Sequence, residues 1–171
     1  MSDPSVQAAE GIAEEAAAEV RWLDPDERAA WMTFAALMFK LPAALDVQLQ
    51  RDSGLSHFEY LVLAGLSEAP AGMLRMSDLA GFANGSLSRL SHVVKRLEQR
   101  GWVQRRPFEE DGRITVAAIT EAGFEQVVAA APGHVMAVRE YVIDTLTPAQ
   151  LRQLREIGAQ VLDRVDPGKS C

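Results

Sequence analysis

Apolar residues recur every three or four positions after residue 25, which is the spacing of one face of an amphipathic helix. The first run contains Trp31, Phe34, Leu37, Met38, Leu41, Leu45 and Leu49. Asp24 is expected to cap this helix, with Pro25 at its first position, and the helix should run to about Arg51 with a bend at Pro42.

Three shorter helices are predicted next in the chain. A capping box at Ser56 opens one that extends to about Glu68. Ser77 is the expected N-cap of the next helix. Ser86 caps the third of them, which carries Leu87, Leu90, Val94 and Leu97 and ends at Gly101.

After this helix the helical spacing of apolar residues ends, and the composition becomes typical of extended strands. Segments 102–106 and 114–119 have β-type composition and flank a turn signal at 109–112, which predicts a β-hairpin. Thr120 should cap a helix that Pro132 kinks or interrupts before it continues to Leu146, and Thr147 opens a last helix with a second capping box.

Three helices followed by a hairpin is the element order of a winged helix-turn-helix. The predicted fold class is therefore mainly α with a small β-hairpin wing, a winged helix-turn-helix core flanked by long N- and C-terminal dimerisation helices. Such a small core leaves the terminal helices with apolar faces to bury, and a homodimer supplies the surface. The expected divisions are an acidic extension (1–20), an N-terminal dimerisation helix (21–53), a DNA-binding domain (54–120), C-terminal dimerisation helices (121–166) and a tail (167–171).

Charge is distributed unevenly along the 171 residues, whose net charge is −7. Residues 1–30 hold eight acids and two bases, whereas residues 86–113 hold seven bases and four acids, a net of +3. A local basic segment can bind a polyanion although the whole chain is acidic.

No apolar run is expected to span a membrane and no leader is evident, so we expect a cytoplasmic protein without a membrane partner.

The helix that begins after Ser86 presents small, hydrogen-bonding and cationic side chains opposite its apolar face. They are Ser88, His92, Lys95 and Gln99, with Arg89 and Arg96 beside them. Such side chains suit the major groove, although ordinary solvated helix faces are also often charged. At the hairpin tip, Arg113 can reach a minor groove with Asp111 orienting it. On the incoming strand, Arg105 and Arg106 are placed for phosphate contact. The alternative interpretation is that Arg113 and Asp111 form an ordinary surface ion pair in the turn.

These segments resemble the MarR family of transcriptional regulators, and the version found here is similar to a group common in actinobacteria. The resemblance rests on residues 74–80, 88–103, 111–113 and 119–123. It implies a dimer on a pseudo-palindromic operator, with helix 86–100 in the major groove and Arg113 in the minor groove. It also implies a repressor that a small molecule releases. The expected DNA-contacting residues are Ser86, Ser88, Arg89, Ser91, His92, Lys95, Arg96, Arg105, Asp111 and Arg113.

The family usually offers an effector cleft between its dimerisation helices and its winged core. A cleft for a phenolic or other aromatic ligand would be lined here by Trp31, Phe34, Met38, His57 and Phe58. The alternative is that these residues simply pack in a core, as aromatic residues at helical spacing more often do. The three histidines are widely spaced and the one cysteine, Cys171, is the last residue, so no metal site, cofactor or redox switch is expected. No catalytic motif is present, which argues against an enzyme; the remaining alternative is a winged-helix interaction module that does not bind DNA.

Overall fold

The computed structural model describes residues 20–108 and 111–167. The predicted acidic extension up to residue 19 and the end of the predicted tail, with Cys171, lie outside these residues. The chain divides into two units, one up to Lys40 and one from Leu41 onward. Helix α2 (Pro25–Ser53) begins in the first unit and ends in the second. Asp24 caps it as predicted, since its Oδ1 accepts hydrogen bonds from the backbone N–H groups of Asp26 and Glu27, both at 2.8 Å.

Helix α2 corrects one expectation from the sequence. An 18-residue window within it has a mean hydropathy of 1.3, so the prediction that no segment is apolar enough to cross a membrane is wrong by length and composition. Alanine and methionine fill the positions between the large apolar residues and raise the average. This remains weak evidence for a membrane, because helices that pack against protein pass the same test.

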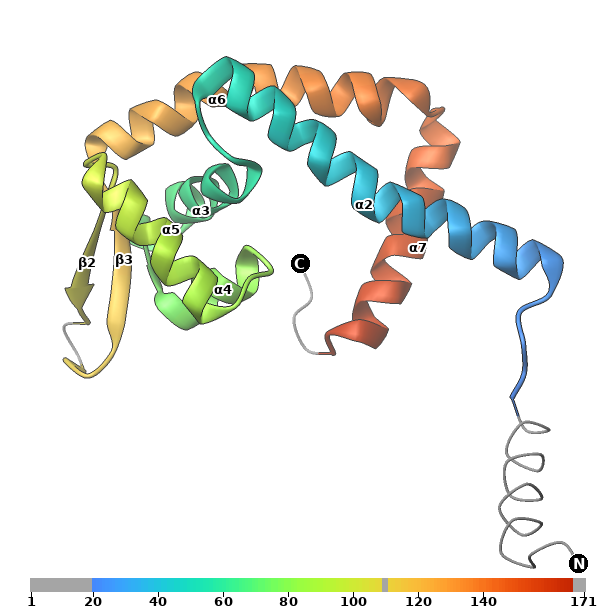
Figure 1. Ribbon diagram of the computed structural model, residues 1–171, viewed down its shortest axis with the longest axis horizontal. Helices are drawn as coiled ribbons and strands as arrows, with labels where there is room; N and C mark the ends of the chain where they lie inside the picture. Colours follow the sequence, from blue (N-terminus) through green and yellow to red (C-terminus); the bar gives the residue numbers. More distant parts are fainter. Residues whose placement is uncertain (1–19, 109–110, 168–171) are drawn as a thin grey trace, which may run out of the picture. The chain divides into compact units, whose positions relative to one another are not determined.

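The second unit contains the predicted winged helix-turn-helix (Figure 1). Its elements are α3 (His57–Glu68), a 3₁₀ turn (Pro70–Gly72), β1 (Met73–Arg75), α4 (Met76–Phe82), α5 (Leu87–Gln99), β2 (Val103–Pro107) and β3 (Thr115–Ile119). One apolar core joins α3, α4 and α5 to the sheet and to α6, and its completely buried side chains include Leu49, Leu63, Leu66, Leu79 and Leu90. The core thus holds α5 with one face inward and the other exposed.

Two local predictions in this unit need correction. The sheet has three strands in the order β1-β3-β2 rather than a hairpin alone, because Met73–Arg75 pairs antiparallel with β3. Three residues are too few to show a period of two in the sequence. Ser77 is not an N-cap, because α4 starts at Met76, two residues earlier than predicted, and the Ser77 hydroxyl donates to the carboxylate of Asp78 instead.

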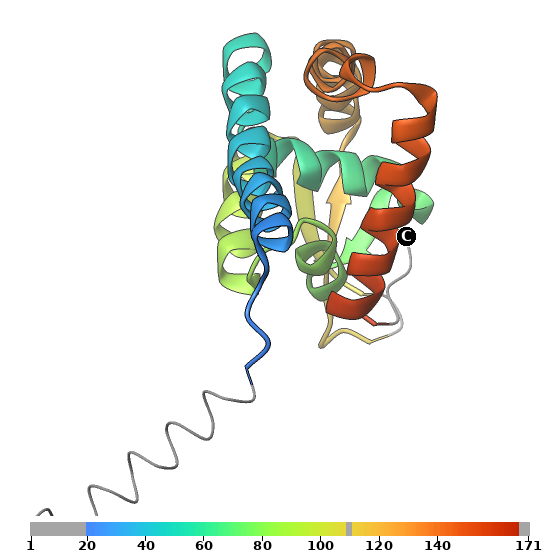
Figure 2. The ribbon, with the colours of Figure 1, turned by 90° about the vertical axis from the view of Figure 1, so that its right-hand side faces the viewer.

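Two further helices follow the sheet. Helix α6 (Glu121–Tyr141) continues through Pro132 without interruption and ends before a 3₁₀ turn (Ile143–Thr145), so its predicted extension to Leu146 is wrong. Helix α7 (Pro148–Val165) begins with the predicted capping box at Thr147 and turns away from the axis of α6 (Figures 1 and 2). None of the residues of α7 is buried.

Candidate nucleic-acid interface

Helix α5 is fixed at both ends by its own sequence. The Ser86 hydroxyl accepts a hydrogen bond from the backbone N–H of Arg89, and Gly101 follows the helix with φ at +75°. Leu90, Val93, Val94 and Leu97 are buried, at 5% exposure or less. Ser88, His92, Lys95 and Gln99 are exposed and Ser91 is half-buried, so the polar face expected from the sequence is on the surface.

Two cations of α5 contact α3 rather than standing free in solvent. The Arg89 guanidinium lies over the Phe58 ring, 4.2 Å from its centroid. The Arg96 Nη2 lies 3.2 Å from Glu59 Oε1, and the Glu59 side chain is only 5% exposed. Burial alone would raise the pKa of Glu59, but hydrogen bonds from Ser56 and the charges of Arg96 and Arg100 lower it overall. Glu59 therefore stays ionised and ties α5 to the start of α3.

A cavity of about 340 Å³ lies beside this contact. Its lining comes from the last turns of α2, the start of α3 and the outer side of α5, and consists of Asp46, Ser56, Phe58, Arg89, His92, Val93 and Arg96. One wall thus carries two guanidinium groups and an imidazole, and Phe58 supplies an aromatic surface. Three predicted DNA-contacting residues share this cavity with one predicted effector residue.

The wing is attached to α5 through Arg105. In the antiparallel pairing of β2 with β3, Arg105 lies opposite Ala117. Its backbone N–H and its Nε both donate to Glu98, at 2.9 Å each, and its Nη2 donates at 2.6 Å. The hydrogen bonds from Arg105 lower the pKa of Glu98. Arg105 therefore orients the hairpin against α5, and its guanidinium is already engaged by a carboxylate.

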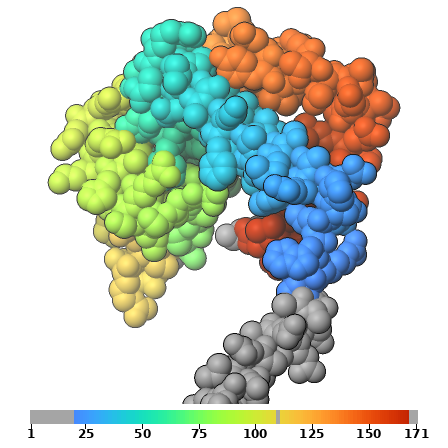
Figure 3. Space-filling model, turned by 45° about the vertical axis from the view of Figure 1, so that its right-hand side comes forward, coloured from blue at the N-terminus to red at the C-terminus, as the bar shows by residue number. Residues whose placement is uncertain are grey.

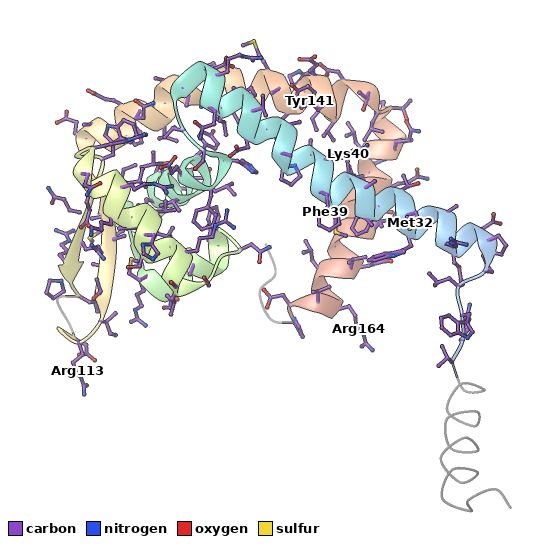
Figure 4. All side chains as sticks on the ribbon, viewed as in Figure 1. Met32, Phe39, Lys40, Arg113, Tyr141 and Arg164 are labelled. Atoms are coloured by element: carbon purple, nitrogen blue, oxygen red, sulfur yellow. The ribbon has the colours of Figure 1, made fainter. Side chains whose placement is uncertain are left out.

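Arg113 is at the tip of the wing, where its side chain points away from the rest of the second unit (Figure 4). Its side chain is 92% exposed. Its Nε and Nη2 donate to the two carboxylate oxygens of Asp111 at 3.1 and 3.3 Å, and its backbone N–H donates to Asp111 Oδ1. These hydrogen bonds lower the pKa of Asp111. The bidentate pair that the sequence predicts is thus formed, and the wing projects from the surface in the space-filling view (Figure 3).

Arg75 is a cation of this surface that reasoning from the sequence missed. It stands at the end of β1, and its guanidinium lies 5.1 Å from the centroid of the Phe108 ring on the wing. Its charge also contributes to the lowered pKa of Asp111. The sequence signal for Arg75 was weak, because its proximity to the wing depends on β1, which pairs with a strand far along the chain.

The five predicted effector residues fall into both units. Trp31, Phe34 and Met38 belong to the first, where they are 52%, 41% and 44% exposed. His57 and Phe58 belong to the second, and Phe58 is 7% exposed. The five residues thus belong to two units that are described separately, and their common cleft remains a prediction.

His57 also belongs to a small cluster of rings between α3 and α6. Its ring centroid lies 6.0 Å from that of His134, which in turn lies 4.5 Å from the Tyr60 ring. Burial lowers the pKa of both histidines, and the charge of His57 lowers that of His134 further. Among the described residues, no three His, Cys, Asp or Glu side chains are grouped as a metal site would require.

Comparisons with known proteins agree on one family. The MarR family model matches residues 55–115. Sco3205, described as a MarR family transcriptional regulator from Streptomyces coelicolor and solved in complex with DNA, is 43% identical over 89% of this chain and 95% of its own, with a TM-score of 0.83. AbsC, a MarR family transcriptional regulator from the same organism, is 37% identical over 85% of this chain and 98% of its own, with a TM-score of 0.80.

A curated relative extends the agreement beyond solved structures. The uncharacterized HTH-type transcriptional regulator YdcH of Bacillus subtilis is 30% identical over 80 residues, which are 46% of this chain and 54% of that protein. The model match covers the winged core, and the Streptomyces structures also cover most of the flanking helices. The chain therefore belongs to the MarR family of transcriptional regulators.

Proposed function

We propose that the protein is a cytoplasmic, homodimeric repressor that binds a pseudo-palindromic operator and is released by a small molecule. One observation carries the DNA-binding part. The exposed face of α5 and the wing tip with Arg113 present hydrogen-bonding and cationic groups from one folded unit. In helix-turn-helix proteins the recognition helix enters the major groove, and a guanidinium at a wing tip suits a narrow minor groove. The 43% identity to Sco3205, solved with DNA, supports the same role.

The homodimer is supported by unpartnered apolar side chains on α7. They recur at helical spacing and are Leu154, Ile157, Val161, Leu162 and Val165, between 42% and 73% exposed. An amphipathic helix with no buried residue needs another surface to cover its apolar face. Two copies would place two α5 helices on successive major grooves, about 34–36 Å apart.

The effector is supported by the cavity beside α5. Its aromatic and cationic lining suits an aromatic carboxylate or phenol, and Arg89 and His92 belong both to that lining and to the predicted DNA contacts. A ligand that favours a different spacing of the two α5 helices would shift the population away from the DNA-binding state.

The DNA-binding proposal is tested by fluorescence anisotropy at several salt concentrations, with duplexes from beside the protein's own gene and a scrambled duplex. Selective binding is expected, and Arg113→Ala should weaken it more on A·T-flanked than on G·C-flanked sites. Arg152→Ala, which removes an exposed positive charge from α7, is the matched control. Equal losses on both flanks would exclude minor-groove reading by Arg113. No selective binding to any duplex, including duplexes selected from random DNA, would favour an interaction module.

A further inference from the structure

Leu87 departs from the pattern of the other aliphatic residues of α5. Leu90, Val93, Val94 and Leu97 are between 0% and 5% exposed, whereas Leu87 is 56% exposed. The sequence places Leu87 with the core residues by its spacing. In the structure it is the first residue of the helix, and its side chain remains largely in solvent. An aliphatic side chain is thus displayed on the surface that the proposed function assigns to DNA.

The position of Leu87 is set by the helix cap. Ser86 is extended, with φ −68° and ψ 152°, and its hydroxyl accepts a hydrogen bond from the backbone N–H of Arg89, so Leu87 starts the first turn. At about 100° per residue, Leu87 lies at the edge of the apolar face, next to Ser91 one turn later and beside Ser88. Recognition helices contact base edges mainly with residues of their N-terminal part.

Phe82 of α4, the other large exposed apolar residue near this end of α5, has a packing explanation. It is 53% exposed, but its ring covers Gly65 of α3, where an added Cβ would lie 2.7 Å from two ring carbons. The exposed part of Phe82 is therefore the outer side of a ring that packs between α4 and α3. Leu87 has no such packing role, because it does not belong to the core cluster.

The chemistry of leucine restricts what it can recognise on DNA. It has no hydrogen-bond donor or acceptor, so it contributes nothing to a phosphate or to the polar edge of a base. In the major groove only thymine presents a methyl group, at C5, and apolar side chains contact it. We infer that Leu87 reads a thymine C5-methyl group in each half of the operator. This inference rests on the proposed DNA-binding function.

The test exchanges single dT nucleotides for dU, which removes the methyl group and leaves the pairing edge unchanged. Duplexes are first selected from random DNA by the full-length protein, and each dT of a half-site is then replaced in turn. For the wild type, we expect one replacement per half-site to weaken binding about fourfold, the value of one buried methyl. Leu87→Ala should bind the dT duplex more weakly than the wild type and bind the dT and dU duplexes equally.

Matched variants separate this result from a general loss of structure. Leu87→Ala replaces an exposed residue by a good helix former, and its urea unfolding should match the wild type. Val47→Ala, which trims a side chain of α2 that is 64% exposed, should keep the full response to dU. Wild-type affinity unchanged by every dU, or a Leu87→Ala protein that still responds, would overturn the role of Leu87 alone. Failure to select any duplex would overturn the proposed function and this role together.

Discussion

Glu59→Gln should lower stability and raise the affinity for DNA at the same time. The buried carboxylate accepts hydrogen bonds from the Ser56 backbone N–H at 2.8 Å and the Ser56 hydroxyl at 2.9 Å. It also accepts one from Arg96 Nε at 3.2 Å. Glutamine keeps the shape of the side chain but removes the charge. The variant therefore isolates what the charge contributes to the capping box of α3 and to its contact with α5.

The expected loss of stability follows from these three contacts. Hydrogen bonds to a charged group contribute about 1.5–3 kcal/mol where they are buried. The Arg96 side chain is 56% exposed, so water screens its part of the interaction and that part is below about 1 kcal/mol. We expect a total loss of about 2 kcal/mol, which raises the unfolded fraction about 30-fold. Urea unfolding measures the loss, and a change within about 0.5 kcal/mol would refute the reasoning.

The pH dependence of this loss provides a second check. Because the pKa of Glu59 is lower in the folded protein than in the unfolded chain, its ionised form contributes stability that is fully present above pH ~4.5. This contribution is lost as the pH falls through the folded-state pKa. The difference in stability between the wild type and Glu59→Gln should therefore shrink as the pH is lowered below about 4.5. A difference that stays constant down to pH ~3 would assign the loss to shape rather than charge.

The affinity should change in the opposite direction. Glu59→Gln removes a negative charge from beneath α5 and frees the Arg96 guanidinium for a phosphate. The dependence of log affinity on log salt should then become steeper by up to about one unit. Glu125→Gln, which removes an exposed charge from α6, is the matched control. If affinity fell together with stability, Glu59 would instead serve to hold Arg96 in a DNA-binding position.

Two other predictions test the packing of α6. Because burial lowers the pKa values of His57 and His134, their contribution to stability should be complete above pH ~6.5 and decrease below it, by up to about 1.4 kcal/mol per pH unit for each residue. Replacing both by glutamine should flatten urea-measured stability between pH 5 and 6.5 relative to the wild type, and an unchanged profile would contradict the assignment. Gly123→Ala should destabilise the protein by more than about 2 kcal/mol, because the new Cβ would lie 2.1 Å from the Trp102 carbonyl oxygen.

Features fixed by neighbouring residues could be predicted from the sequence. The capping boxes at Ser56 and Thr147 need a hydroxyl and an acceptor three residues apart, and both are formed. The pair of Asp111 with Arg113 spans two residues, and it is formed as well. In each case a short spacing decides the geometry, so no knowledge of tertiary structure was needed.

Features that depend on distant segments could not be predicted in this way. Arg96 and Glu59 are 37 residues apart, and only the packing of α5 on α3 brings them together. Strand β1 pairs with the edge of β3, far along the chain, and Leu87 is exposed although its spacing matches that of the core residues of α5. The local pattern indicated which residues are cationic or apolar, but tertiary contacts decided which of them are free.

The acidic partners of the basic segment bear on specificity. Glu59, Glu98 and Asp111 each pair with one arginine of the candidate interface. Non-specific affinity for DNA rises with the number of phosphates that cations neutralise, whereas base reading depends on the placement of individual groups. The three carboxylates reduce the net positive charge of the interface, which weakens its long-range attraction for a polyanion. They also hold the guanidinium groups in defined positions. A chain with a net charge of −7 is thereby suited to select a sequence through α5 and the wing without binding every duplex strongly.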